Sequence, residues 1–295
     1  MKHQWTAFGV AFGLTLTGHL RNRLAMAMIA FFIPTWIYLV RATALNKNIT
    51  FHTSTLGIHV TASMNRTIQV SSALHAVTVI AGFMMFMATF SARNMDQRLV
   101  LAGYPRLQLL AAKIATLLVI TALLTGYCTV LLELSWPLTQ PWAVAAALAA
   151  AILAYGGLGV MAGFLLRGEL EGFFVVVMAT LIDVGMQSPV SNPAGDQAGL
   201  EALPLFGPAQ AALAAAFTDT ATFSCAVRAL PWFTATSIMA VLIFCARTRH
   251  YHRLTAARTD DSVGAGVQRS ACGRRGSAVC TEEGQQVADR PPQDL

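Results

Sequence analysis

The sequence WAVAAALAAAILAYGGLGVMAGFLL, from Trp142 to Leu166, contains no charged residue. A helix needs about 20 mostly apolar residues to cross a hydrocarbon core about 30 Å thick, and this stretch is long enough. The whole chain has the same character, because 55% of its 295 residues are hydrophobic and only 12% are charged. A soluble domain carries about 25% charged residues. The sequence therefore predicts a membrane protein.

Five further stretches are long and apolar enough to span a membrane. The fold class that we expect is an all-α membrane protein with six transmembrane helices, and residues 24–250 form its transmembrane domain. The predicted spans are Leu24–Val40, Val70–Phe90, Ile114–Leu134, Trp142–Leu166, Phe173–Val190 and Ala229–Ala246.

The basic residues predict the orientation. The chain has 20 Lys and Arg against 14 Asp and Glu, a net charge of +6. If the N-terminus is cytoplasmic, most of the basic residues fall in cytoplasmic segments, as the positive-inside rule requires. We therefore expect both termini in the cytoplasm and no nucleic-acid partner. The Arg-rich and Ala-rich composition is typical of a bacterial protein, so the expected location is the bacterial inner membrane.

Residues 1–23 precede the first span and are predicted to form an interfacial helix on the cytoplasmic leaflet. Large apolar side chains recur there at helical spacing on one face, at Trp5, Phe8, Phe12, Leu16 and Leu20. The run is short and contains three glycines, which favours an interfacial helix. The alternative is a seventh span, which would invert the orientation of the chain.

Two polar segments complete the organisation of the chain. The first is the outer loop 41–69, in which His52 and His59 lie seven residues apart without a nearby Cys or carboxylate. We interpret these two as solvated loop histidines and expect no metal site. The second is the tail 251–295, expected to be cytoplasmic and mostly disordered, because it carries too little apolar surface to form a core.

The chain contains no motif of a catalytic site. A P-loop is absent, since no Gly is followed by Lys, and no HExxH, CxxC or GxSxG occurs. The sequence therefore predicts neither an enzyme nor a bound cofactor. Gly159 and Gly163 form a GxxxG pattern, which permits close approach of helices. Packing inside the bundle is the preferred reading, and a dimer face is the alternative.

Asp183 is the acidic residue nearest the middle of a predicted span. A carboxylate there costs about 2.5–3.5 kcal/mol on insertion scales, so such a residue is a functional candidate by default. In one interpretation it faces a cavity or a partner rather than lipid, and it would line a possible substrate path if the chain is a transporter. In the other, the short span tilts or starts later and Asp183 lies near the outer interface.

The segment Ser91–Lys113, between spans two and three, carries four basic residues and one acid. An amphipathic turn at Asp96–Ala102 runs into Gly103 and Tyr104, where Pro105 must end the helix because it disfavours helical geometry in the residue before it. A second helix then restarts from Pro105 and enters span three. This elbow is suited to docking against another protein, and the alternative is a basic loop that only fixes topology.

The sequence of this elbow resembles a known family. The run DQRLVLAGYPR at 96–106, followed by LLAAK at 109–113, is similar to the first cytoplasmic loop of ABC-2 type permeases. These are the membrane subunits of type V ATP-binding-cassette exporters. A charged turn at 167–171 and a Pro-bearing run at 203–213 also resemble the family, which folds the latter back into the membrane before its last span.

The resemblance implies a function and partners. It implies a permease subunit that pairs with a second permease, as a homodimer or heterodimer, and docks a separate ATPase subunit that binds ATP and Mg²⁺. The exported substrate would be a drug, antibiotic, lipid or similar compound. The residues implied to contact the ATPase are Asp96, Arg98, Leu99, Gly103, Tyr104, Pro105, Arg106, Glu169 and Glu171.

Two other classes of function stay open at this point. One is a secondary transporter driven by an ion gradient, which needs no ATPase. The other is a non-transporting membrane protein, such as an immunity or assembly factor. Transport that depends on a neighbouring ATPase would distinguish the first class from an exporter subunit.

Overall fold

The structure is a computed structural model that describes residues 2–53, 57–192, 198–219 and 223–246. The described residues up to Phe244 form one compact unit. The predicted tail 251–295 lies outside the described residues. The chain is mostly helical, and a last helix occupies 230–246. The other elements are α1 (Lys2–Arg21), α2 (Arg23–Ala27), the π-helix η1 (Met28–Phe32), α3 (Ile33–Thr43), β1 (Asn48–Thr53), β2 (Ile58–Ser63), α4 (Met64–Leu101), α5 (Arg106–Ser135), α6 (Pro141–Leu165), α7 (Glu169–Gln187), the 3-10 helix η2 (Ala198–Ala202), α8 (Phe206–Phe217) and α9 (Phe223–Val227).

The described residues contain five helices long and apolar enough to cross a membrane. These are Ala25–Thr43, Met64–Leu101, Arg106–Ser135, Pro141–Leu165 and Ser224–Ala246. They coincide with five of the six predicted spans, which supports a multi-pass membrane protein. The predicted span Phe173–Val190 corresponds to α7, which is not among the five and carries three carboxylates in its 19 residues. The sixth span and the interfacial position of α1 stay predictions.

The first span contains a feature that its sequence does not predict. Its helix widens into the π-helix η1 immediately before Pro34, which lies in the first turn of α3. Proline has no N–H to donate and its ring crowds the carbonyl of the preceding turn. A π-helical turn is one way in which a continuous helix accommodates such a residue.

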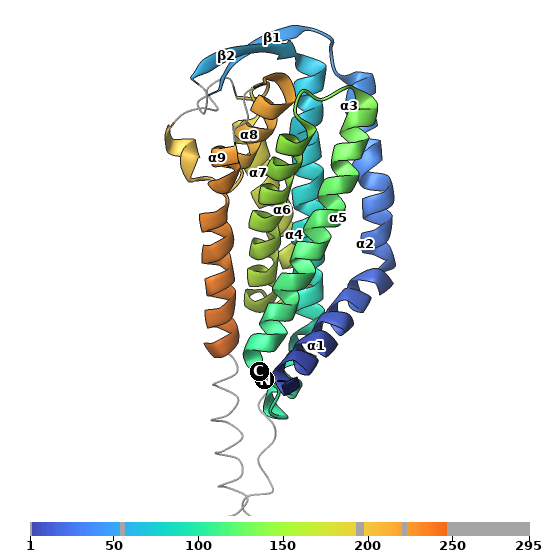
Figure 1. Cartoon of the computed structure of the whole chain (residues 1–295), viewed down its shortest axis with the longest axis vertical. Helices are drawn as coiled ribbons and strands as arrows, with labels where there is room; N and C mark the ends of the chain where they lie inside the picture. Colours follow the sequence, from blue (N-terminus) through green and yellow to red (C-terminus); the bar gives the residue numbers. More distant parts are fainter. Residues whose placement is uncertain (1, 54–56, 193–197, 220–222, 247–295) are drawn as a thin grey trace, which may run out of the picture. The chain divides into compact units, whose positions relative to one another are not determined.

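The segment predicted as a polar outer loop is largely folded. Strands β1 and β2 form an antiparallel hairpin, and α4 begins directly after β2. Phe51 of β1 contacts Phe217 of α8 edge to face, and Phe217 stacks on Trp136, whose other neighbour is the guanidinium of Arg66. These contacts hold the hairpin on the helices. We call this end of the bundle the hairpin end, and the opposite end, where α4 meets α5, the elbow end (Figure 1).

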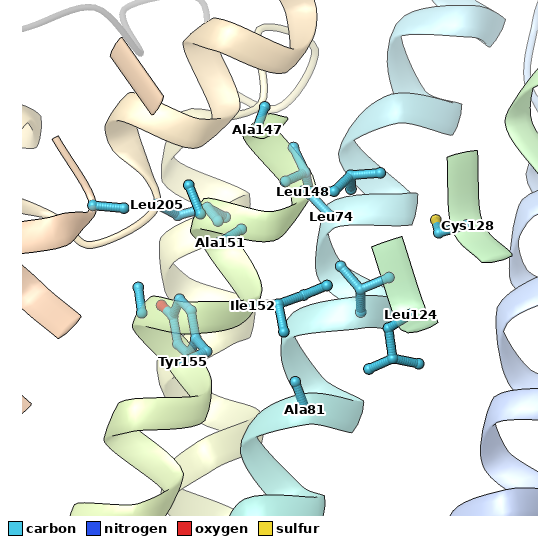
Figure 2. Close-up of a cluster of buried hydrophobic side chains, with 14 of the residues drawn as sticks. Leu74, Ala81, Leu124, Cys128, Ala147, Leu148, Ala151, Ile152, Tyr155 and Leu205 are labelled. Atoms are coloured by element: carbon cyan, nitrogen blue, oxygen red, sulfur yellow. The ribbon is translucent and has the colours of Figure 1, made fainter. Parts of the chain in front are cut away.

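Helices α4 and α6 form the centre of the bundle. Figure 2 shows Leu74 and Ala81 of α4 beside Leu148 and Ile152 of α6 in the buried core. The backbones approach closely at the predicted GxxxG pattern, because a Cβ at Gly159 would collide with the carbonyl oxygen of Gly82 on α4. The same small-residue face continues at Gly163, where a Cβ would lie 2.9 Å from the Phe86 carbonyl oxygen. Packing inside the bundle is therefore confirmed.

Candidate functional site

The elbow between α4 and α5 has the helix break that the sequence predicts. Helix α4 ends at Leu101, and α5 begins at Arg106. Gly103 has a φ of +89°, a conformation that side chains with a Cβ disfavour. Pro105 is the extended residue immediately before α5 rather than its first residue. The segment Asp96–Ala102 is not a separate turn, since α4 is unbroken from the hairpin to the elbow.

A buried ion pair closes the elbow. The Lys113 Nζ lies 3.0 Å from the Asp96 Oδ2, with one residue before the break and the other after it. Both residues are almost fully buried, at 6% exposed for Asp96 and 4% for Lys113. Charges buried to this degree are tolerated when they are paired. The pair therefore fixes how the end of α4 sits against the start of α5.

Lys113 also contacts an aromatic side chain of α6. Its Nζ lies 5.9 Å from the ring centroid of Phe164 on α6, a cation–π distance. Phe164 in turn contacts Phe244 of the last helix, with 5.2 Å between ring centroids. The ion pair of the elbow is thus joined through aromatic contacts to α6 and to the last helix.

Helix α1 packs against α5 beside the elbow. The Tyr104 hydroxyl donates a hydrogen bond to the Ala7 carbonyl oxygen of α1. Near the other end of α1, His19 is buried, and its Nε2 has no hydrogen-bond partner among the described residues. Burial, and less strongly the positive charge of Lys113, lowers the pKa of His19 from 6.5 to about 4. His19 is therefore neutral at pH 7.

The turn between α6 and α7 lies at the same end of the bundle as the elbow. Arg93 of α4 donates a hydrogen bond of 3.0 Å to the Leu166 carbonyl oxygen. The Glu171 Oε2 accepts from the backbone N–H groups of Arg167 and Gly168, at 3.3 and 3.4 Å, which stabilises the first turn of α7. The structure thus brings together the two segments implied to contact an ATPase.

The implied contact residues differ in accessibility. Arg98, Gly103, Glu169 and Glu171 are exposed, whereas Asp96 is buried in its ion pair. The remaining four are half-buried, namely Leu99, Tyr104, Pro105 and Arg106. We therefore assign Asp96 a positioning role within the elbow.

Asp183 lies in a second polar cluster, away from the elbow. The Tyr155 hydroxyl of α6 donates to the Asp183 Oδ2 at 2.6 Å, and the backbone N–H of Leu205 donates to the same oxygen at 3.0 Å. The Gln187 side-chain amide donates to the Asp183 Oδ1. Asp183 is 2% exposed. Three donors therefore take the place of water around this carboxylate.

Leu205 links the Asp183 cluster to the start of α8. Leu205 immediately precedes α8, a short helix buried along almost its whole length. At the other end of α8, the backbone N–H of Gln140 donates to the Ala215 carbonyl oxygen at 3.0 Å. A negative group at a helix N-terminus is favoured by the free N–H groups and the helix dipole. Asp183 thus anchors the start of α8 to α6 and α7. The substrate-path role of Asp183 stays a prediction.

Sequence reasoning missed the partners of both clusters. Tyr155, Gln187 and Leu205 meet Asp183 from three elements, and no local spacing links Tyr155 to a residue 28 positions away. An acidic partner of Lys113 could have been predicted, since a Lys in the Leu-rich start of an apolar helix requires a counter-charge. His19 and Arg93 gave no comparable signal.

The two clusters provide structural contacts, an ion pair at the elbow and hydrogen bonds to Asp183. Among residues 2–53, 57–192, 198–219 and 223–246, no group of three or more His, Cys, Asp or Glu side chains is placed to hold a metal. No family model matches the sequence, and a comparison with curated proteins finds no match.

Proposed function

We propose that this chain is the transmembrane permease subunit of an ATP-binding-cassette exporter. In this proposal it lies in a bacterial inner membrane with both termini in the cytoplasm, pairs with a second permease and docks a separate ATPase at the elbow end. The observation that carries the proposal is the elbow itself: a helix break locked by a buried ion pair, with charged residues exposed around it.

The elbow offers a surface of mixed chemistry for an ATPase. Arg98 presents a positive charge, and the adjacent α6–α7 turn presents Glu169. Two leucines beside the break are also accessible, with Leu101 43% and Leu107 72% exposed. Apolar anchors bordered by charges are typical of protein interfaces.

The buried ion pair supports a role in transmitting movement. A docked partner can drive a conformational change only if it contacts an element that has distinct arrangements in two states. A loose loop would absorb displacement of the partner, whereas Asp96 and Lys113 couple the end of α4 to the start of α5. Displacement at Arg98 would therefore move both helices together.

Co-purification with an ATPase tests the proposal. We expect a P-loop ATPase to be encoded beside the gene; the chain is expressed with that ATPase, and complex formation and ATP hydrolysis are measured. We expect Arg98→Glu to weaken the complex at least about tenfold, a loss of about 1.4 kcal/mol. Lys47→Glu is the matched control, because it makes the same kind of charge change on an exposed residue at the hairpin end.

Two outcomes would contradict the proposal. Equal binding of the ATPase by wild type and the Arg98→Glu variant would remove the elbow as its docking site. Transport that follows a proton gradient and persists without the ATPase would identify a secondary transporter instead.

A further inference from the structure

The hairpin brings together two histidines that are seven residues apart in the sequence. His52 of β1 and His59 of β2 are directly opposite each other in the antiparallel register. Their ring centroids are 5.1 Å apart, and the ring planes are inclined by 59°. Residues paired in this way have Cβ atoms about 4.5–5.5 Å apart, close enough for both side chains to reach one ligand.

The two rings lie on the outward face of the hairpin. Phe51 and Val60, which alternate with the histidines along the strands, are buried at 8% and 7% exposure. His59 is exposed and His52 is partly exposed. The next pair on the same face is Thr50 and Thr61, whose hydroxyl oxygens are 3.1 Å apart.

The separation of the rings fits a shared metal ion. A Zn²⁺–imidazole bond is about 2.0–2.1 Å long, which places each ring centroid about 3.2 Å from the metal. Two such rings at a tetrahedral angle have centroids about 5.2 Å apart. The observed 5.1 Å therefore needs little movement of the strands.

We propose that His52 and His59 form a two-histidine site for a divalent transition metal on the hairpin. Imidazole nitrogens suit Cu²⁺, Ni²⁺ and Zn²⁺, whereas Mg²⁺ and Ca²⁺ prefer oxygen ligands. Strands β1 and β2 carry no Asp, Glu or Cys, so the two imidazoles are the strongest metal ligands that the strands offer, and solvent would fill the remaining coordination positions. The bound metal would join the two strands over the contact between Phe51 and Phe217. The site is independent of the exporter proposal.

Metal titration of the full chain tests the site. The reference protein, purified without a polyhistidine tag, has His3, His250 and His252 replaced by Ala, which leaves His19, His75 and the hairpin pair. Isothermal titration with Cu²⁺, Ni²⁺, Zn²⁺ and Mg²⁺ gives the affinities. Electron paramagnetic resonance of the Cu²⁺ form gives the number of nitrogen ligands.

We expect one Cu²⁺ per chain with two nitrogen ligands, weaker Ni²⁺ and Zn²⁺ binding, and no Mg²⁺ binding at the same concentrations. His52→Ala or His59→Ala should weaken Cu²⁺ binding at least about tenfold, because each turns a chelate into a single contact. Both residues lie on the outward face, so neither variant removes a side chain from the core.

A variant with the histidine pair moved along the hairpin tests whether binding depends on their direct pairing across the strands rather than on the presence of two histidines. Replacing both histidines by Thr while introducing Thr50→His and Thr61→His moves the pair to the neighbouring register position. This variant should restore binding. A diagonal pair, made by His52→Thr with Thr50→His and His59 retained, should bind less tightly, since diagonal positions are about 7–8 Å apart.

Three results would overturn the proposal. They are unchanged Cu²⁺ affinity in His52→Ala and His59→Ala, a Cu²⁺ signal with a single nitrogen ligand in the reference protein, and a relocated pair that binds no better than the diagonal one.

Discussion

Lys113, two turns into α5, forms an ion pair with Asp96, near the end of α4, with 3.0 Å between Nζ and Oδ2. Gly103 and its left-handed backbone lie between the two residues in the sequence. Two features therefore hold the elbow. One is the turn at Gly103, whose positive φ favours glycine, and the other is the buried ion pair between α4 and α5.

Lys113→Met should destabilise the protein strongly, because it leaves the Asp96 carboxylate buried without a counter-charge. Breaking a buried pair in this way costs about 3–5 kcal/mol. The double variant Asp96→Asn with Lys113→Met should recover most of the loss, since neither buried residue then carries a charge. Thermal unfolding in detergent measures both. A single variant as stable as wild type would show that the pair does not hold the elbow.

Tyr155→Phe should destabilise the protein by about 1.5–3 kcal/mol, the value of a hydrogen bond to a charged group. The removed hydroxyl donates to the Asp183 Oδ2 at the start of α8. Tyr127→Phe is the control, because Tyr127 makes no hydrogen bond within the described residues. Hydrogen exchange of the α8 amides should rise in Tyr155→Phe only. An unchanged α8 would contradict the anchoring role of Asp183.

Gly159→Ala should destabilise the bundle, because its Cβ meets the Gly82 carbonyl oxygen of α4. Overpacking of this kind costs about 1–3 kcal/mol. Gly126→Ala on α5 is matched to it, since a Cβ there meets nothing within 4 Å. The control should be neutral or more stable by up to about 1 kcal/mol. Equal melting temperatures for the two variants would argue against the close α4–α6 contact.

Docking of α1 should weaken in acid because of His19. The pKa of His19 is lowered to about 4 by burial and by Lys113, so the ring binds its proton more readily when α1 is detached. The docked state therefore loses stability as the pH falls from about 6.5 to 4, by about 1.4 kcal/mol per pH unit at most. Hydrogen exchange of the α1 amides, corrected for intrinsic rates, should rise over this range.

His19→Leu should remove this dependence on pH, because an apolar side chain fills the site without titrating. Exchange in α1 that rises equally in wild type and in this variant would assign the effect to other groups.

The sequence predicts the parts of the fold that depend on local composition. The charge-free run in α6 identifies a span without further context, and Gly103 with Pro105 marks the break to within a residue. These signals work because the hydrocarbon core excludes charge and because proline restricts the backbone of the residue before it.

Other features depend on contacts between distant residues. The sequence predicts a loop where the structure has the hairpin. Ile49 and Phe51 alternate with polar residues in β1, but the threonines, asparagines and histidines of this segment also suit a solvated loop. The cluster around Asp183 needs Leu205 at the start of α8, and the fold alone brings that backbone N–H to the carboxylate.

The length of α4 has a mechanical consequence. Its 38 residues extend over about 57 Å at 1.5 Å per residue, nearly twice the thickness of a hydrocarbon core of about 30 Å. The helix begins at β2 and ends at the elbow without a break. If it pivots at its midpoint, a tilt of about 10° displaces each end by about 5 Å, in opposite directions. A rod of this kind acts as a lever, which would carry a push at Arg98 to the strands that hold His52 and His59.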